Sequence, residues 1–234
     1  MKIPLSDRLL ACCNFISPGD RVADIGCDHG YLSLYLLTNG IASSVIASDI
    51  NEGPLQSAKR NAEKFGVADK IAFYLSNGVQ SIPRDFDTLV CAGMGADTMI
   101  SILEAAPWLK SDAYRLILQC QSKRPTLRRY LADQGWHIAR ETLVKGGKFF
   151  YPIMEVVYAP GHSLTDAQCH ITPALINDNS PLLPAFIRWV TDGMETAVNG
   201  LSRTGGEKYE KQRLLLRELS AIAQMPLDAP AGDS

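Results

Sequence analysis

The amino-acid sequence predicts an α/β fold, namely a doubly wound, mostly parallel sheet with an antiparallel end strand, followed by a C-terminal helical hairpin. Three observations lead to this prediction. Short apolar runs typical of buried strands alternate with helical patterns through residue 134. Four residues separate the next two expected strands, which is too few for a parallel crossover. Beyond residue 182 the apolar positions recur at helical spacing in two runs.

The elements follow in order along the chain. A helix is expected over residues 4–16, where apolar residues recur every three or four positions until Ser-Pro-Gly-Asp interrupts them. Strands are expected over residues 21–25, 44–49, 70–75, 88–92, 115–119, 136–144 and 149–159. Helices are expected over residues 31–38, 54–65, 96–105 and 125–134. Pro54 near the start of the second of these helices and Gly66 at its end mark its boundaries.

The pattern changes after residue 160. Residues 163–180 are polar and rich in turn formers, so we expect no regular element there. Two amphipathic runs across a short glycine break predict an antiparallel helical hairpin. The expected domains are therefore residues 1–160, a hairpin over residues 161–226 and a disordered tail over residues 227–234.

Composition limits the class of protein. Hydrophobic residues make up 46% of the 234 and charged residues 21%, which is ordinary for a soluble globular protein. No window approaches the roughly 18 apolar residues of a membrane span, and charge within the first eight residues argues against a signal peptide. The six cysteines form no CxxC pair and several lie in apolar strand patterns, so we expect buried free thiols, no metal site and a cytoplasmic protein.

Positive charge is concentrated in one segment, although the net charge is only −2. Between residues 115 and 148 there are eight Lys or Arg and two acidic residues. This excess is either a footprint for phosphate groups or a set of solvated faces, and the sequence favours neither.

The turn after the first expected strand is the strongest functional signal. Gly26 permits a sharp turn at the carboxyl end of that strand, and Gly30 permits close packing of the next helix. A dinucleotide-binding loop would place glycine at positions 26, 28 and 31, but Asp28 would repel a pyrophosphate and Tyr31 replaces the third glycine. This pattern points to S-adenosyl-L-methionine (AdoMet), which carries no phosphate, and disfavours a nucleotide-dependent oxidoreductase.

Further candidate cofactor-binding residues follow the next strands. Asp49 is placed to accept hydrogen bonds from ribose hydroxyls, or alternatively to cap the following turn. Asn77 and Gly78 are placed to meet the adenine, or alternatively form a plain turn. The complete expected cofactor set is Asp24, Gly26, Cys27, Gly30, Asp49, Ile50, Asn51, Asn77, Gly78, Val79, Gly93 and Met94.

Several of these segments together resemble one known family. The segments are Leu5-Ser6-Asp7-Arg8-Leu9, Ala23-Asp24-Ile25-Gly26 with Asp28-His29, Ile50-Asn51-Glu52-Gly53-Pro54-Leu55, Ser57-Ala58-Lys59 and Ala92-Gly93-Met94-Gly95. They resemble the bacterial tRNA (adenine(22)-N1)-methyltransferases, the TrmK-like family, over roughly residues 3–158. The resemblance implies a Rossmann-like class I methyltransferase fold, AdoMet as donor, tRNA as acceptor and N1 of an adenine in the D-arm, position 22, as target. The predicted hairpin takes the place of that family's coiled-coil C-terminal domain.

The expected chemistry assigns roles to three groups near the turn. Adenine N1 holds a lone pair, so alignment matters more than a strong base. Asp28 is the candidate that either stabilises the developing positive charge or takes a proton from N6. Arg8 would hold a phosphate or orient Asp28, and His29 lies beside them. The alternatives are a helix cap for Asp28, a surface ion pair for Arg8 and an ordinary loop histidine for His29. The expected substrate-binding residues are Gly95, Gln119, Lys123, Arg124, Arg128 and Arg129.

Two other functions stay open at this point. One is a methyltransferase that acts on another RNA site or on a small molecule. The other is a module that binds AdoMet or RNA without turnover. Neither the oligomeric state nor the tRNA species follows from the sequence.

Overall fold

A computed structural model describes residues 3–202 and 205–224 of the chain. The described chain divides into two compact units, one that extends to Ser163 and one from Leu164 onward. The expected disordered tail over residues 227–234 lies outside the described residues. Among those described, no helix is long and apolar enough to cross a membrane.

In the described part of the first unit, seven strands form one sheet in the order β3-β2-β1-β4-β5-β7-β6. The strands are β1 (Asp20–Ile25), β2 (Ala42–Asp49), β3 (Ile71–Leu75), β4 (Thr88–Met94), β5 (Arg115–Cys120), β6 (Trp136–Gly146) and β7 (Phe149–Tyr158). Neighbouring strands from β3 to β5 pair in parallel, and β7 pairs antiparallel with both β5 and β6. The mostly parallel sheet with an antiparallel hairpin at its end is therefore confirmed, and the antiparallel strand lies between β5 and the edge strand β6.

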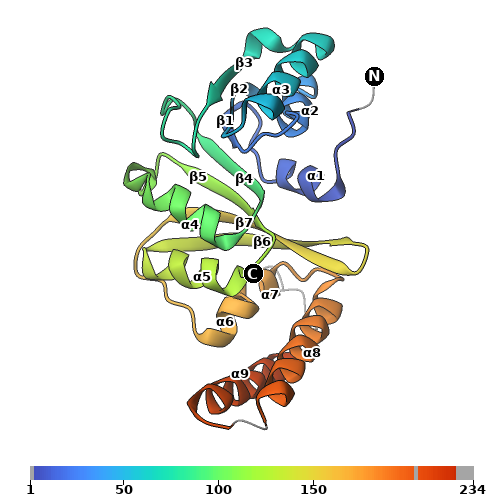
Figure 1. Cartoon of the computed structure of the whole chain (residues 1–234), viewed down its shortest axis with the longest axis vertical. Coiled ribbons are helices and arrows are strands. Elements are labelled where there is room, and N and C mark those ends of the chain that lie inside the picture. Colours follow the sequence, from blue (N-terminus) through green and yellow to red (C-terminus); the bar gives the residue numbers. More distant parts are fainter. Residues whose placement is uncertain (1–2, 203–204, 225–234) are drawn as a thin grey trace, which may run out of the picture. The chain divides into compact units, whose positions relative to one another are not determined.

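Helices cover both faces of this sheet (Figure 1). They are α1 (Asp7–Cys13), α2 (Tyr31–Thr38), α3 (Glu52–Phe65), α4 (Ala96–Glu104) and α5 (Arg124–Asp133). Buried residues of α1, α2 and α3 form one cluster with alternate strand residues such as Val22, Val90 and Ile117. The strand residues between these, such as Leu89 and Leu116, point to the other face, where α4 and α5 pack.

The first helix is shorter than the sequence pattern predicts. It begins at Asp7 after Ser6 and ends at Cys13, whereas helical spacing of apolar residues continues to Ile16. Residues 14–16 instead form tight turns, in which the N–H of Phe15 donates to the carbonyl of Cys12 and that of Ile16 to Cys13. Phe15 and Ile16 are still buried, which explains why their periodicity looked helical.

The second unit is helical. It contains α6 (Asp166–His170), α7 (Pro173–Asn177), α8 (Leu183–Leu201) and α9 (Glu207–Ala223). The long pair α8 and α9 packs together, as the hairpin prediction requires, with Leu219 fully buried. The expectation of no regular element in residues 163–180 is wrong. Thr165 forms a capping box with Gln168 that starts α6, and the Thr172 hydroxyl accepts the N–H of Leu175 at the start of α7.

Candidate active site

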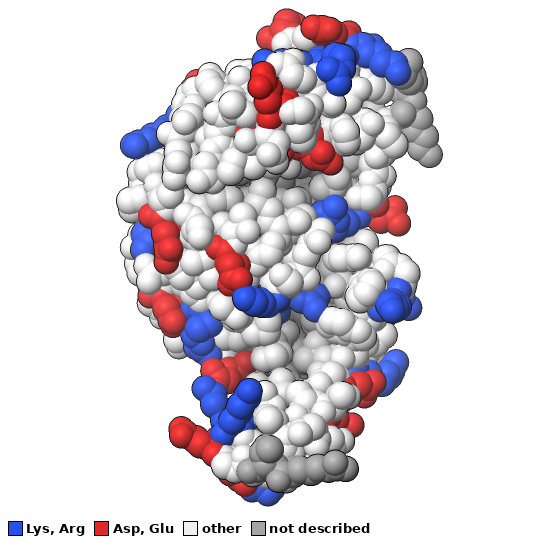
Figure 2. Space-filling model, in the orientation of Figure 1, with Lys and Arg blue, Asp and Glu red and all other residues white. Residues whose placement is uncertain are grey.

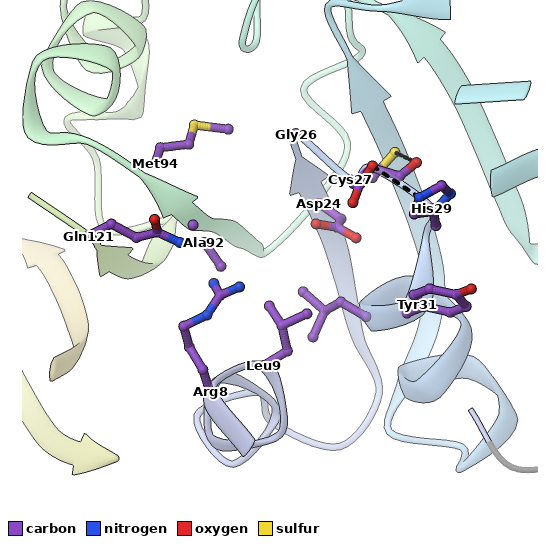
Figure 3. A pocket seen from close by; sticks show the side chains of 13 residues that line it. Arg8, Leu9, Asp24, Gly26, Cys27, His29, Tyr31, Ala92, Met94 and Gln121 are labelled. Atoms are coloured by element: carbon purple, nitrogen blue, oxygen red, sulfur yellow. Dashed lines mark hydrogen bonds and ion pairs between the residues drawn. The ribbon is translucent and has the colours of Figure 1, made fainter. Parts of the chain in front are cut away.

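The carboxyl ends of the parallel strands and the helix α1 enclose a cavity of about 260 Å³ (Figure 3). Its lining combines charged groups with bare backbone. The lining residues are Arg8, Leu9, Asp24, Gly26, Cys27, Asp28, His29, Tyr31, Leu32, Ala92, Gly93, Met94 and Gln121. This position outside the carboxyl edge of a parallel sheet is the usual place for a ligand in such folds.

The turn after β1 is held by backbone conformation and by β2. The N–H groups of Gly26 and Cys27 both donate to the carbonyl of Ser48, at 2.8 and 2.9 Å. Gly26, Asp28 and Gly30 all adopt left-handed backbone conformations, with φ of 73°, 51° and 74°. A Cβ on Gly26 would lie 2.3 Å from the terminal methyl of Met94, so this turn needs glycine there. The burial of Cys27 raises the pKa of its thiol, which keeps it neutral.

Gly30 brings the turn against α3. A Cβ at Gly30 would lie 3.0 Å from the Cβ of Ala58 and 3.4 Å from its Cα. The sequence-based role of Gly30, close packing of the following helix, agrees with this geometry.

Asp24 carries a carboxyl group buried in the floor of the site. It is 5% exposed and accepts a hydrogen bond of 2.6 Å from the Ser33 hydroxyl. Burial raises the pKa of Asp24 to about 6, although the Ser33 bond acts in the opposite direction. In Figure 3 the Asp24 carboxylate and the Arg8 guanidinium point into the same cavity from β1 and α1.

Asp49 lies at the end of β2 and holds the adjoining backbone. Its two carboxylate oxygens accept the N–H of Asp28 at 3.2 Å and that of Asn51 at 2.9 Å. The capping role considered for Asp49 is thus present, and the same carboxylate also links the β2 end to the turn after β1.

The remaining candidates for the adenosine part lie along the sheet edge, outside the cavity lining. Ile50 is 63% exposed, and Asn51 and Asn77 are exposed. Gly78 and Val79 are buried, and a Cβ at Gly78 would lie 2.8 Å from the side chain of Ile102. The exposed members form a rim that continues from the cavity past Asp49.

Asp28 and His29 stand at the cavity rim. Their side chains are 70% and 50% exposed, and His29 Nε2 lies 3.7 Å from Asp28 Oδ1. The carbonyl of His29 accepts a hydrogen bond of 3.0 Å from the Asn61 side chain, which ties this loop to α3.

Arg8 reaches across the site to the end of β5. Its Nη1 donates to Oε1 of Gln119 at 2.7 Å, and the same oxygen accepts the N–H of Gly93 at 3.2 Å. Among the described residues, Nε2 of Gln119 is buried without a hydrogen-bond partner. Gly93 has a φ of 88°, and a Cβ there would lie 3.2 Å from the Arg8 guanidinium. The expected orientation of Asp28 by Arg8 is not what the structure shows, since the Arg8 guanidinium donates to Gln119.

Two expected substrate-binding side chains are corrected by the structure. Gln119 is fully buried and therefore cannot meet the edge of a base, whereas the exposed Gln121, two residues later, lines the cavity. Arg128 is 1% exposed and forms an ion pair with the buried Glu141, so it holds α5 to β6 and does not face a ligand.

Several other basic side chains between positions 115 and 148 also form ion pairs or hydrogen bonds within the protein. Lys123 forms an exposed ion pair with Asp97 at 2.6 Å, and Arg124 donates to the carbonyl of Phe150 at 2.8 Å. Burial lowers the pKa of Arg124, and Arg129 is half-buried. Arg115 and Arg140 pair with acidic residues, including Glu155. Figure 2 shows Lys and Arg side chains interspersed with Asp and Glu over the visible face. The visible face therefore carries no continuous basic surface.

Sequence reasoning missed some lining residues, and the signals for them were weak. Leu9 and Tyr31 belong to apolar helix patterns, and Ala92 ends an apolar strand. Gln121 had a usable signal, because it follows β5 at the edge where a ligand is expected. Gly95 starts α4 beside Ser122, and a Cβ there would lie 2.9 Å from the Ser122 hydroxyl.

The described residues contain no cluster of three or more His, Cys, Asp or Glu that could hold a metal ion. All six cysteines are buried, as the sequence predicts.

Comparison with known proteins agrees with this geometry. The family described as "Methyltransferase domain" matches residues 5–154, more than half of the chain. The tRNA (adenine(22)-N(1))-methyltransferase of Bacillus subtilis is 33% identical over 154 residues, which cover 65% of this chain and 65% of that enzyme.

Solved structures extend the similarity to the C-terminal unit. The B. subtilis m1A22 tRNA methyltransferase TrmK has a TM-score of 0.78 at 27% identity, covering 95% of this chain and 97% of that one. Streptococcus pneumoniae Sp1610, in complex with S-adenosyl-L-methionine, has a TM-score of 0.82 at 27% identity, covering 94% and 100%. The chain therefore belongs to the methyltransferase domain family and, within it, to the TrmK-like group.

Proposed function

We propose that this protein transfers the methyl group of AdoMet to N1 of an adenine in tRNA, at position 22 in the D-arm. The observation that carries the proposal is the single cavity in which Asp24, Asp28 and Arg8 meet the glycine turn after β1 and the backbone at Gly93 and Met94. The activity of the B. subtilis relative supports the choice of reaction and acceptor. A tRNA-modifying role also implies action in the cytoplasm.

The residues fit AdoMet chemically. The methionine end of AdoMet carries an ammonium and a carboxylate, and the cavity offers the Asp24 carboxyl and the Arg8 guanidinium. At about 260 Å³ the cavity is smaller than the 300–1,000 Å³ of a typical whole-ligand site. We therefore assign the methionine end to the cavity and the adenosine to the rim formed by Ile50, Asn51 and Asn77, with Asp49 facing the ribose. When bound, AdoMet supplies an electrophilic methyl group.

The residues of the protein then align the target base with the methyl group and stabilise the charge that develops on it. Adenine N1 has a lone pair, so the protein has to exclude water and hold the base in line with the methyl group. The exposed carboxylate of Asp28 stands at the rim, where it stabilises the positive charge that the base acquires. His29 is placed to set the orientation of that carboxylate, and Gln121 to hydrogen-bond the edge of the base.

The acceptor must present an unpaired base. N1 lies on the Watson–Crick edge, so the target adenine is unstacked or flipped before it enters the site. Lys123, Arg124 and Arg129 and the helical hairpin α8–α9 are proposed to bind the folded RNA through its shape and phosphates.

Incubation with labelled AdoMet and unmodified tRNA, followed by digestion to nucleosides, tests this function. The expected product is N1-methyladenosine from position 22. Label in another nucleoside, or label only in a small molecule, would assign a different acceptor. AdoMet binding without turnover on any tRNA pool would reduce the protein to a binding module.

A further inference from the structure

The tip of the β6–β7 hairpin, residues 145–150, extends beyond the edge of the sheet at which the cavity opens. The last residue pair between β5 and β7 is Leu118 with Met154. Continuing that register places Pro152 opposite Cys120, where β5 ends. The three residues that precede Pro152 in β7 therefore project about 10 Å further. Figure 1 shows the hairpin reaching past the other strands on the side of α1.

The hairpin tip carries positive charge and an exposed aromatic ring. Lys145 and Lys148 are exposed, and their ammonium groups lie 5.7 and 5.4 Å from the ring centroids of Phe150 and Phe149. The tip contains no acidic residue. The nearest acids along the two strands, Glu141 and Glu155, are buried and paired with arginines. The positive charge of the tip is therefore not neutralised by an acidic residue of β6 or β7.

Phe149 is not explained by packing. It is 48% exposed, and among the described residues it is the aromatic side chain that belongs to the exposed large hydrophobics. Its neighbour Phe150 is 5% exposed, and Arg124 of α5 donates to the Phe150 carbonyl. Phe150 therefore anchors the tip to the body of the unit, while Phe149 turns to solvent at a defined place.

We propose that the hairpin tip binds the RNA strand beside the target adenine, with Phe149 stacked on an unpaired base and Lys145 and Lys148 on flanking phosphates. An exposed aromatic ring and two cations on one short tip match a single-stranded or looped nucleic acid, which offers base faces and phosphates in alternation. This inference rests on the proposed function, because the cavity must take its base from that same strand.

The tip variants are Phe149→Leu, Phe149→Tyr and the double variant Lys145→Ala/Lys148→Ala. Binding to unmodified tRNA is measured by filter retention at several salt concentrations, and AdoMet affinity by calorimetry. The double variant is expected to lower the slope of log affinity against log salt by one to two, since each phosphate contact contributes about 0.7–0.9. Phe149→Leu is expected to weaken tRNA binding about fivefold or more, whereas Phe149→Tyr keeps the ring and retains affinity.

Lys64→Ala is the matched control. Lys64 is exposed in the last turn of α3, which starts at the carboxyl edge after β2 and ends at the opposite edge of the sheet. Its loss should leave tRNA affinity unchanged. All variants should bind AdoMet as the wild type does.

The outcomes separate the two proposals. If the wild type methylates tRNA but the tip variants bind it like the wild type, the tip is no RNA contact and the proposed function stands. If Phe149→Leu and Phe149→Tyr weaken binding equally, stacking is refuted. If the wild type neither binds nor methylates tRNA, both proposals fall together.

Discussion

Arg8 on α1 and Gln119 at the end of β5, 111 residues apart, are joined by a hydrogen bond of 2.7 Å between Nη1 and Oε1. The same Gln119 oxygen accepts the N–H of Gly93 at the end of β4. A buried amide thus fixes a cation of the N-terminal helix and a glycine turn with positive φ in one place. Gln119 itself does not line the cavity, yet it holds two of the residues that do.

Replacing Gln119 should affect stability as well as binding, because its oxygen serves two donors. Gln119→Leu leaves the Arg8 guanidinium and the Gly93 N–H without this acceptor, and we expect a loss of about 1–3 kcal/mol in the free energy of unfolding together with weaker AdoMet binding. Gln121→Leu, at the exposed lining position, should keep both and lower kcat/KM for tRNA. Urea denaturation, calorimetry and methylation kinetics compare the two. Equal effects of the two variants would contradict this division of roles.

The raised pKa of Asp24 leads us to expect opposite pH trends for the stability of the protein and for its affinity for AdoMet. The folded carboxyl has a pKa of about 6, above its usual value of 3.8, so the folded protein takes up a proton between these values. This group therefore favours folding at the low end of the range and disfavours it at pH 7. At pH 7, Asp24→Asn should raise the free energy of unfolding by about 1–3 kcal/mol and therefore also the melting temperature. The proposed contact between Asp24 and the ammonium group of AdoMet needs the ionised carboxylate, so the affinity of the wild type for AdoMet should fall as the pH drops through 6. Calorimetry between pH 5 and 8 would reject the role of Asp24 if affinity stayed flat.

Gly30 and Gly40 allow the cost of overpacking to be separated from the cost of the backbone conformation. Both have positive φ, 74° and 65°, but a Cβ at Gly30 meets Ala58 at 3.0 Å while a Cβ at Gly40 meets nothing within 4 Å. Both alanine variants share the backbone cost of about 1 kcal/mol. Gly30→Ala should lose a further ~1 kcal/mol or more from overpacking. Ala58→Gly removes the clashing Cβ but costs about 1 kcal/mol within α3, so Gly30→Ala/Ala58→Gly should be more stable than the sum of the two single variants by the overpacking part. Thermal or urea unfolding of these variants and of Gly40→Ala decides, and identical losses at positions 30 and 40 would remove the contact with α3 from the explanation.

Asp28 should matter for turnover more than for AdoMet binding. Its side chain is 70% exposed, but its φ of 51° suits Asp, Asn or Gly better than Ala. Asp28→Asn therefore keeps the turn and removes the charge. We expect AdoMet affinity within a few fold of the wild type and a fall in kcat by about a hundredfold. Undiminished turnover would show that the carboxylate plays no part in the reaction.

The C-terminal unit can be tested by removal. A chain that ends at Ser163 retains the compact first unit with the whole cavity lining. We expect it to bind AdoMet as the full chain does and to bind tRNA more weakly, since α8–α9 is proposed to contact the RNA. Circular dichroism checks folding, and filter binding measures tRNA affinity. Full tRNA affinity in a folded truncated chain would assign α8–α9 a structural role.

The fold was predictable because its signals are local. Alternating strand and helix patterns, Gly66 after α3 and the short link before β7, which is two residues long in the structure, each depend on neighbouring residues. The failures also have local causes. Phe15 and Ile16 are buried by tight turns that keep helical spacing, and the short helices α6 and α7 rest on capping by Thr165 and Thr172 in a segment that reads as loop.

The position of the site was predictable from the sequence, but the burial of individual side chains was not. Gln119 and Gln121 lie two residues apart at the same strand end, and only the end of β5 decides which of them is buried. Arg128 belonged to a basic segment, but its partner Glu141 lies on β6, and pairing across elements cannot be read from spacing. The sequence contained one hint of this pairing, because Glu141, one of the two acidic residues in the segment, lies within an apolar strand pattern.

Because β7 runs antiparallel to β5 and β6, the link between β6 and β7 lies at the carboxyl edge of the parallel strands, where the cavity opens. Residues added to or taken from that link would lengthen or shorten a projection beside the cavity without disturbing any parallel crossover. On the proposed role of the tip, changes within this one short loop would alter RNA binding and leave the parallel strands on the donor side of the sheet unchanged.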